Sequence, residues 1–180
     1  MHLLDKFKYC PVCGSPRFEE NDFKSKRCAD CGFVYYFNAA GAVVSVIVNE
    51  RGELLVARRA CEPAKGTLDL IGGFADCGEG AEDSMVREIQ EEPGLEIKQT
   101  DLKYLFSIPD VYEYSGLTLH TMDIFYLCHI PSDSVVKAED DVAECFWASI
   151  NDINPKDFGL DSIRMAVERI LSNPEIISKK

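Results

Sequence analysis

Residues 73–95 read GFADCGEGAEDSMVREIQEEPGL, and this stretch decides how the rest of the chain is interpreted. It holds seven acidic residues and one base, a net charge of −6, which is half of the chain's −12. Ala81, Met85 and Ile89 recur every four residues, a spacing that places them on one face of a helix. The pattern therefore predicts an acidic helix over residues 80–92.

Three glutamates in the second half of this helix share one side. Glu88, Glu91 and Glu92 stand at positions i, i+3 and i+4, where like charges cost about 0.2–0.5 kcal/mol per pair. A hard divalent cation turns this cost into a gain, because Mg²⁺ is bound by carboxylate oxygens and water. Pro93 follows directly and disfavours helical dihedrals at Glu92, so the helix is expected to end there, with Gly94 in a left-handed turn. The alternative to a metal site is a solvated acidic face.

The spacing of the fixed residues favours the metal site. Gly73 is followed by five residues, Glu79, seven residues and then REIQEEPGL, residues 87–95. This pattern resembles the Nudix box, G-x5-E-x7-R-E-U-x-E-E-x-G-U with U aliphatic, and all nine specified positions are filled. The resemblance implies an α/β fold, a mixed sheet between helices in an α/β/α sandwich. It also implies an enzyme that cleaves the diphosphate bond of a nucleoside diphosphate joined to another group.

The same resemblance implies the metal ligands. Mg²⁺ or Mn²⁺ would be held by Glu88, Glu91 and Glu92, and the carbonyl of Gly72 is a further candidate ligand. Bare backbone at Gly72 and Gly73 also lets a phosphate approach closely.

The remaining catalytic roles are implied for residues around the helix. Arg87 is expected to orient a glutamate by bidentate pairing, and Glu79 to favour the helix N-terminus and support the preceding loop. The proton acceptor is left open between Glu91, Glu92 and the distant Glu144. The nearby Glu139 is a further candidate for an additional base or metal ligand.

A separate unit precedes the region that resembles a Nudix domain. Two Cys-x-x-Cys pairs, Cys10 with Cys13 and Cys28 with Cys31, are separated by 14 residues. Four thiolates in two pairs suit a closed tetrahedral Zn²⁺ site, and the metal would supply the folding energy that residues 1–38 lack. A rubredoxin-like iron site and redox-active cysteine pairs are the alternatives. We therefore expect a structural zinc ribbon over residues 1–38 and a Nudix domain over residues 39–180.

Charge and hydropathy limit the partners and the location. Residues 1–38 carry a net charge of +1 and the rest of the chain −13, so no basic stripe for a nucleic-acid backbone is evident. A structural or homodimer-forming ribbon is the expectation. The longest apolar run, residues 39–48, is shorter than the ~20 residues that span a bilayer. With no signal peptide recognised, we expect a cytoplasmic protein whose scattered cysteines are reduced.

The remaining segments give the sheet and the last helix. Strands are expected at residues 42–48, 54–59, 68–74, 102–107, 117–130 and 143–150. Asn49 to Gly52 is interpreted as a turn, and residues 108–116 as a loop. Asp161 is expected to cap a final amphipathic helix that runs to Leu171.

Four side chains are candidates for substrate contacts. Arg58 and Arg59 end a strand, where either guanidinium could clamp a substrate phosphate or form a surface salt bridge. Tyr112 and Tyr114 could stack on a base or nicotinamide ring, or pack across neighbouring strands.

The four-cysteine module ahead of a Nudix box is similar to the NADH pyrophosphatase group and to its relatives that act on ADP-ribose or FAD. NADH pyrophosphatases carry a Ser-Gln-Pro-Trp-Pro-Phe-Pro motif after the box, whereas residues 106–112 here read FSIPDVY. This difference favours ADP-ribose or FAD over NADH. The alternatives are removal of an RNA cap, a (d)NTP pyrophosphohydrolase that releases pyrophosphate, and a Nudix module that binds a nucleotide without cleaving it.

Overall fold

The computed structural model describes residues 2–138 and 142–178 and divides into two compact units. One unit contains Met1–Ala39 together with Val111–His120, and the other contains Ala40–Asp110 together with Thr121–Lys180. The grouping of residues 111–120 with the N-terminal segment was not expected from the sequence.

The N-terminal segment is a small antiparallel sheet beside two cysteine turns. Its strands, in order, are β1 (Phe18–Asp22), β2 (Ser25–Cys28) and β3 (Val34–Tyr36). Phe18, Cys10 and Cys28 form its buried apolar cluster, with Phe7 and Phe33 packed against them, and Leu4 is also buried. Such a core is too small to stabilise a fold of this length alone.

The second unit is built on a mixed sheet. In the described residues its main path runs β10-β5-β4-β9-β8, β6 pairs with β5, and β7 pairs with β4. The strand bounds are β4 (Ala40–Val48), β5 (Glu53–Arg59), β6 (Leu68–Asp69), β7 (Gly72–Phe74), β8 (Lys103–Tyr114), β9 (Leu117–His129) and β10 (Val142–Ser149). The central pair, β4 and β9, is parallel, whereas β5 pairs antiparallel with β4 and with β10.

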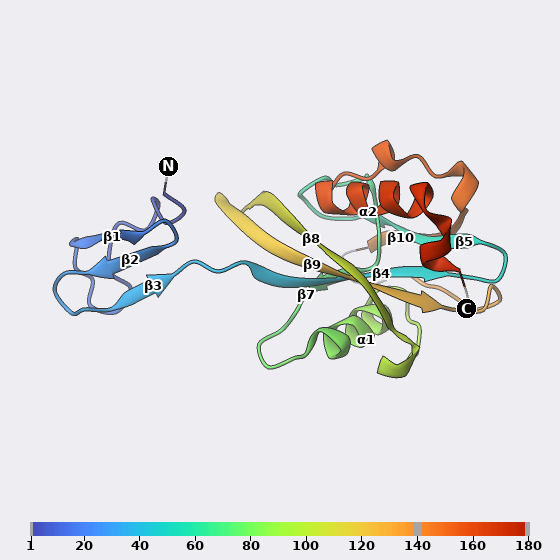
Figure 1. Ribbon diagram of the computed structural model, residues 1–180, viewed down its shortest axis with the longest axis horizontal. Coiled ribbons are helices and arrows are strands. Elements are labelled where there is room, and N and C mark those ends of the chain that lie inside the picture. The colour runs from blue at the N-terminus through green and yellow to red at the C-terminus, as the bar shows by residue number, and fades with distance from the viewer. Residues whose placement is uncertain (1, 139–141, 179–180) are drawn as a thin grey trace. The chain divides into compact units, whose positions relative to one another are not determined.

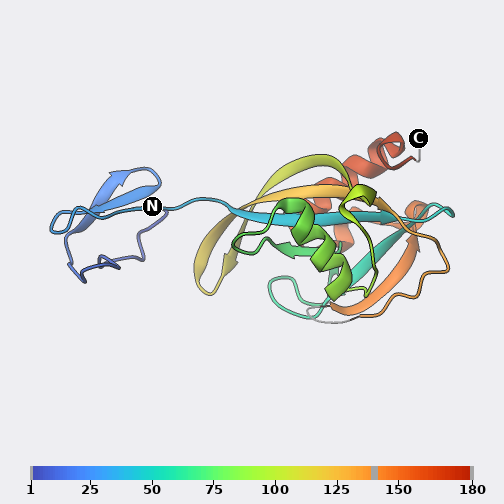
Figure 2. The same cartoon turned by 90° about the horizontal axis from the view of Figure 1, so that it is seen from below.

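Two helices cover the two faces of this sheet (Figures 1 and 2). Helix α1 (Ala81–Glu91) packs on one face and α2 (Asp161–Ser172) on the other. Short 3-10 turns complete the described elements: η1 (Gln99–Asp101), η2 (Ile150–Asp152), η3 (Pro155–Asp157) and η4 (Pro174–Ile177). The expected α/β/α sandwich with a mixed sheet is confirmed.

Strand β4 explains why its sequence is almost continuously apolar. Val44 and Val46 point into the core beneath α2, whereas Val43 and Ile47 point into the core beneath α1. Alternate side chains of a strand face opposite sides, so a strand covered on both faces requires apolar residues throughout. No helix within the described ranges has the length and apolar character needed to cross a membrane.

Two expectations about strands were wrong. Residues 68–74 form two short strands that pair with different neighbours, and between them Leu70 enters the core beneath α2 while Ile71 enters the core beneath α1. Residues 108–114 continue β8, because Ser115 and Gly116, both at positive φ, make a two-residue turn directly into β9. Pro109 is tolerated because β8 is an edge strand.

The start of α2 also differs from expectation. Leu160 occupies the N-cap position and Asp161 is the first helical residue, so Asp161 does not cap the helix. Its carboxylate accepts from Arg164 at 2.9 Å and lies at the positive end of the helix dipole. The expected inward face is confirmed, since Ile163, Ala166, Val167 and Ile170 are all buried.

Candidate functional site

Arg87 is the centre of an ion-pair network on α1. Its Nη1 donates to Glu88 Oε1 at 2.8 Å and to Glu91 Oε2 at 2.9 Å, and its Nε donates to Glu79 Oε1 at 3.0 Å. Its Nη2 donates to the backbone carbonyl of Phe74 at 3.1 Å. One guanidinium is thus placed to orient three carboxylates and to tie β7 to the helix.

Glu79 fastens the loop before α1 to the helix. Its Oε2 accepts from the Ser84 hydroxyl at 2.7 Å and from the Asp76 backbone N–H at 3.3 Å. The hydrogen bonds from Arg87, and then from Ser84, lower the pKa of Glu79 to about 2. Glu79 is therefore ionised at neutral pH and compensates part of the positive charge of Arg87.

The two glycines of β7 contact two buried carboxylates in different ways. A Cβ atom on Gly73 would lie 2.6 Å from Glu88 Oε1, so this carboxylate occupies the space that any side chain at position 73 would need. The backbone N–H of Gly72 donates to Glu92 Oε2 at 3.1 Å. Glu88 and Glu92 are both buried, so the glycine backbone forms a cradle for charged oxygens.

Glu92 keeps helical dihedrals despite the proline after it. Its φ of −82° and ψ of −63° lie in the right-handed helical region, and its N–H bonds the carbonyl of Glu88 at 3.0 Å. The helix ends with Glu92 as its C-cap, as expected, but the expected departure from helical dihedrals at Glu92 was wrong, because the bonds to Glu88 and Gly72 hold the residue in place. The expected left-handed turn is confirmed, since Gly94 has a φ of +71° and the N–H of Leu95 bonds back to Ile89.

The donor set fits a hydrated divalent cation. The side chain of Glu91 is about half exposed, while Glu88 and Glu92 are buried beside it. Within the described ranges, the carboxylate oxygens of Glu88, Glu91 and Glu92 are not all within 4.8 Å of one another. The three carboxylates therefore do not converge on one point. Mg²⁺ characteristically uses one or two carboxylates, several waters and substrate phosphate oxygens, which this arrangement allows. The carbonyl of Gly72 as a ligand stays a prediction.

The two candidate phosphate clamps are both engaged in ion pairs. Arg59 pairs with Asp69 and donates from Nε to the Pro63 carbonyl at 2.7 Å. Arg58 donates from Nε to Glu144 Oε2 and from Nη1 to the Gly66 carbonyl. The sequence left open a phosphate clamp or a salt bridge for each arginine, and the structure shows a salt bridge for both. Both side chains also bond to carbonyls of the loop between β5 and β6.

Glu144 is exposed on β10 and belongs to the pair with Arg58. Its neighbour Cys145 packs against the core beneath α1, and burial, followed by the charges of Glu92 and Glu144, raises the pKa of that thiol to about 12. Glu144 as a base stays a prediction. Glu139 lies outside the described residues.

The two candidate stacking tyrosines belong to the end of β8. Tyr114 is 55% exposed, and it falls in the segment that groups with the N-terminal unit. The side chain of Tyr112 lies outside the described part of the chain. A role of either ring in substrate binding stays a prediction.

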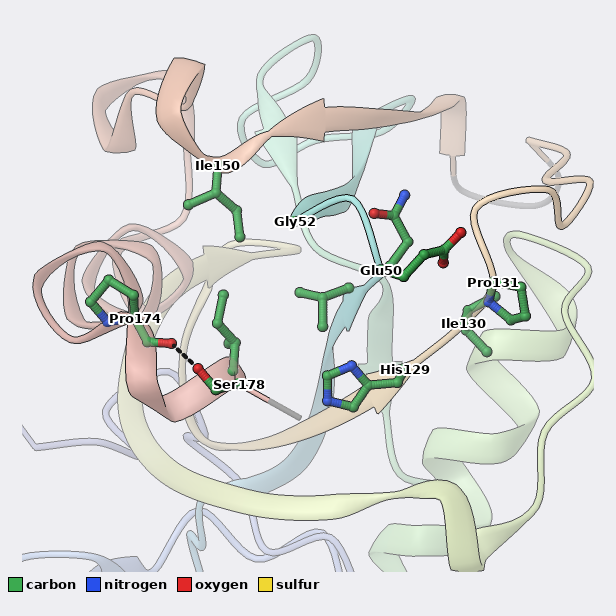
Figure 3. Close-up of a pocket in the computed structure, with 11 residues that line it drawn as sticks. Glu50, Gly52, His129, Ile130, Pro131, Ile150, Pro174 and Ser178 are labelled. Carbon is green, nitrogen blue, oxygen red and sulfur yellow. Dashed lines mark hydrogen bonds between the residues drawn. The ribbon is translucent and has the colours of Figure 1, made fainter. Parts of the chain in front are cut away.

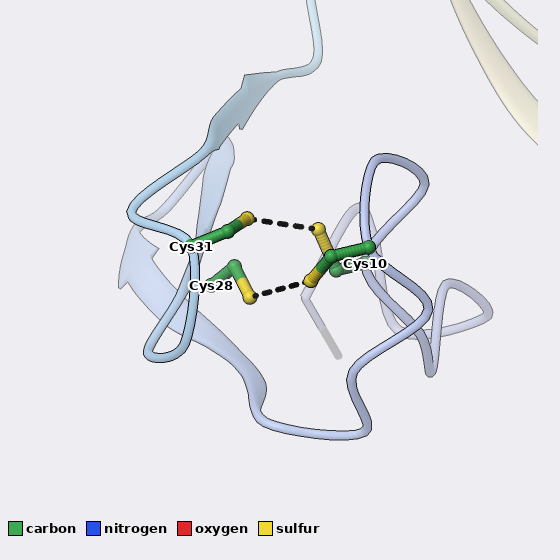
Figure 4. Close-up of side chains that lie close together, drawn as sticks. Cys10, Cys28 and Cys31 are labelled. Carbon is green, nitrogen blue, oxygen red and sulfur yellow. Dashed lines mark hydrogen bonds between the residues drawn. The ribbon is translucent and has the colours of Figure 1, made fainter.

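The four paired cysteines form a candidate metal centre. The Sγ atoms of Cys10, Cys13, Cys28 and Cys31 all lie within 4.8 Å of one another (Figure 4). Backbone N–H groups of Cys31 and Asp30 lower the pKa of Cys28 to about 6, whereas hydrogen bonds among the thiols and burial raise the pKa of Cys13 to about 12 and also raise that of Cys31. The glycine after each second cysteine has positive φ, as expected from the tight turns.

A pocket of about 450 Å³ lies at the C-terminal ends of β4 and β9 (Figure 3). Val48, His129, Ile130 and Ile177 are among its lining residues, and no residue of the stretch 73–95 lines it. It is therefore distinct from the candidate catalytic site.

Sequence reasoning missed a group of buried polar side chains on the α2 face of the sheet. Asp123 and Ser162 are hydrogen bonded at 2.5 Å, and Asp110 and Thr121 lie beside them. A signal was present, because Asp123 directly precedes the apolar run IFYLC, residues 124–128. A buried carboxylate in such a strand must be satisfied by partners from other elements.

The comparison with protein families identifies the class. Residues 39–166 match the model of the NUDIX domain, which covers most of the chain. The chain therefore belongs to the NUDIX domain family of hydrolases, as the box on α1 indicated.

Individual relatives place it within that family. It is 24% identical over 154 residues to the NAD-capped RNA hydrolase NudC of Vibrio parahaemolyticus, with 86% of this chain and 55% of the relative covered. It is 27% identical over 157 residues to the protein of the same name from Haemophilus influenzae, with 86% and 56% covered. The chain thus spans about half the length of these relatives. The resemblance to the NADH pyrophosphatase group is confirmed by the sequence similarity to these relatives.

Solved structures support the fold. A NUDIX hydrolase from Nitrosomonas europaea superposes with a TM-score of 0.67 at 20% identity, covering 93% of this chain and 92% of the other. The NUDIX domain of Shewanella oneidensis NrtR, solved with ADP ribose, superposes with a TM-score of 0.59 at 18% identity, covering 75% and 90%. At sequence identities this low, the similarity to these structures shows only that the fold is shared.

Proposed function

We propose that this chain hydrolyses the diphosphate bond of a nucleoside diphosphate derivative such as ADP-ribose, FAD or NADH, and releases two monophosphates. The observation that carries the proposal is the pair of buried carboxylates, Glu88 and Glu92, held against bare glycine backbone beside the Arg87 network. Relatives named as NAD-capped RNA hydrolases and a NUDIX domain solved with ADP ribose favour dinucleotide-like substrates.

Each residue then has a role in the reaction. Water attacks one phosphorus, the bond from that phosphorus to the bridging oxygen breaks, and the other phosphate leaves with the bond electrons. Bound Mg²⁺ would neutralise the diphosphate and lower the pKa of a coordinated water. Glu88, Glu91 and Glu92 would supply the anionic oxygens that hold it, and Glu91, Glu92 or Glu144 would accept the proton of the attacking water. Arg87 and Glu79 position these carboxylates.

The N-terminal unit has a structural role in this proposal. Residues 1–38 form a ribbon in which Cys10, Cys13, Cys28 and Cys31 bind Zn²⁺, and residues 39–180 form the Nudix domain. Four thiolates grouped this closely are the donor set of a closed zinc site. A homodimer and a cytoplasmic location remain predictions from the sequence.

A substrate screen tests the activity. The protein with saturating Mg²⁺ is incubated with ADP-ribose, NADH, FAD and (d)NTPs, and the products are identified by mass. Two monophosphates from a dinucleotide-like substrate are expected, whereas a preference for (d)NTPs with pyrophosphate as product would contradict the proposal. Binding of ADP-ribose with no turnover of any substrate would identify a nucleotide-sensing module instead.

Glu92→Gln is the variant that links turnover to the site. Loss of this carboxylate is expected to lower kcat by ~10²-fold, because metal-borne charge neutralisation is worth several kcal/mol. Glu96→Gln is the matched control, since Glu96 is an exposed glutamate beyond the end of α1. Equal turnover of the two variants would place the metal site elsewhere.

A further inference from the structure

A groove lies between the edge strand β8 and helix α2. Its volume is about 470 Å³, which falls within the ~300–1,000 Å³ of sites for small ligands. Residues 107–109 of β8 form one side, and Met165, Glu168, Arg169 and Ser172 of α2 form the other. No residue of the stretch 73–95 lines this groove, so it is separate from the candidate catalytic site and independent of the proposed function.

The α2 side of the groove is one face of the helix. Its four residues stand at positions i, i+3, i+4 and i+7, which lie along one side of a helix. Met165 is 48% exposed although it is apolar. Because methionine adapts its shape to whatever packs on it, this side chain provides an apolar surface for a ligand.

Arg169 is held in position by an aromatic ring of the core. Its guanidinium carbon lies 4.2 Å from the centre of the Phe106 ring, within the range of a cation–π contact. Phe106 is buried in the core beneath α2, so the ring is fixed. A guanidinium stacked on a fixed ring has less freedom to lose when a ligand binds.

The hydrogen-bond donors of Arg169 are directed to solvent. In the residues that the structure describes, this guanidinium forms no hydrogen bond and no ion pair. By contrast, Arg164 on the same helix is paired with Asp161 at 2.9 Å. The five N–H groups of Arg169 are thus available to an anion, and their planar arrangement matches the two oxygens of a carboxylate.

The other residues of the groove limit the charge and shape of that anion. Glu168 adds a negative charge on the same side, which disfavours a phosphate monoester of charge about −1.5 to −2 more than a carboxylate of charge −1. Ile108, Pro109 and Met165 are apolar. The groove therefore suits a carboxylate attached to an apolar body.

The edge of β8 favours a small molecule over an extended peptide. A peptide that paired with this edge would need the backbone N–H groups of β8 as donors. Pro109 has no N–H and lies in the lined part of the strand. Proline on an edge strand is a device against pairing with another strand.

We propose that this groove binds a small organic acid with an apolar body. The carboxylate accepts two hydrogen bonds from the guanidinium of Arg169, and the apolar body packs on Met165 and Pro109. The site belongs to the Nudix domain but shares no residue with the box.

Methyl NMR of the methionines tests the site in the full chain. Met165 reports on the groove, and Met122, which is 49% exposed and does not line it, is a matched control for nonspecific apolar contacts. The protein is titrated at pH 7 with hexanoate, hexanol and acetate. We expect hexanoate to shift the Met165 methyl without shifting Met122. It should bind about tenfold more tightly than the other two, because it alone has both the carboxylate and the chain.

Three variants locate the effect. Arg169→Leu keeps an apolar contact with Phe106 and removes the guanidinium, so it should weaken hexanoate about tenfold and leave hexanol unchanged. Arg169→Lys keeps the charge without the planar donors and should fall between the two. Arg164→Leu removes an arginine that does not line the groove and should keep the wild-type affinity.

Several results would overturn the proposal. Equal shifts of Met165 and Met122, or equal affinities for hexanoate and hexanol, would show nonspecific binding. Wild-type affinity in Arg169→Leu would remove the guanidinium from the site. If that variant does not fold, the comparison of hexanoate with hexanol still decides. Tighter binding of hexyl phosphate than of hexanoate would refute the carboxylate assignment. Tighter binding of a tetrapeptide with a free C-terminal carboxylate would refute the assignment to a small molecule.

Discussion

Replacing Gly73 with alanine should inactivate the enzyme while leaving it folded. The added Cβ would meet Glu88 Oε1 at 2.6 Å, its Cδ at 2.9 Å and its Oε2 at 3.0 Å, all shorter than ordinary van der Waals contacts. These three atoms belong to a side chain, so the carboxylate must move by roughly 1 Å to restore normal separation. Gly73 does not have positive φ, so alanine fits its backbone.

The magnitude follows from that displacement. A misplacement of about 1 Å in a catalytic constellation can cost ~10²-fold in rate. Stability should fall by at most about 2.6 kcal/mol, since the loss of unfolded-state entropy contributes about 0.4–1 kcal/mol and offsets part of an overpacking cost of about 1–3 kcal/mol. The assay is kcat for ADP-ribose at saturating Mg²⁺, together with urea unfolding.

The control is Gly41→Ala, whose Cβ would meet only the Cβ of Ala75 at 3.8 Å. It should retain wild-type turnover. Near-wild-type kcat in Gly73→Ala, with the fold intact, would show that Glu88 need not stay where the structure holds it, and the reasoning about the glycine cradle would fail.

Three further outcomes are expected. Cys13→Ser should lower the zinc content from about one ion per chain and lower the stability of the N-terminal unit, as measured by elemental analysis and proteolysis; full metal content in this variant would refute a four-cysteine site. The pKa of Glu79 falls from 4.5 to about 2 on folding, so its contribution to stability is present above pH 4.5 and is lost as the pH drops toward 2. In Glu79→Gln, the urea concentration at the unfolding midpoint should therefore depend less on pH between 4.5 and about 2. An unchanged pH dependence would contradict the Arg87 network. Tyr114→Ala should raise KM for a dinucleotide by roughly threefold to tenfold if its ring stacks on substrate, whereas an unchanged KM would remove it from the site.

The parts of the structure that follow from local patterns were predictable. The helix over the box, the buried strand β4 and the cysteine turns each depend on a repeat or spacing that can be read within a few residues. The left-handed turn at Gly94 likewise follows from a glycine after a proline. These features are determined by residues close together in the chain.

The partners of individual side chains could not be predicted, because they come from elements far apart in the sequence. Arg58 meets Glu144 across 86 residues, and Asp123 meets Ser162 across 39. Neither pair has a spacing that a periodic pattern would reveal. The extension of β8 was missed for a different reason, since Pro109 and Gly116 are typical of loops, and only the position of β8 at the sheet edge makes a proline acceptable there.

Helix α1 ends with its charges in an unfavourable order. Its last turn contains no basic residue, and Glu88, Glu91 and Glu92 all lie near the negative end of the helix dipole. Arg87 and the Gly72 N–H relieve part of this cost, and a bound cation would relieve more of it, so the folding equilibrium itself should report metal concentration. A site filled at 100 times its Kd would add about 2.7 kcal/mol to the free energy of unfolding. Melting curves in a series of divalent ions should therefore rank their affinities in the absence of any substrate.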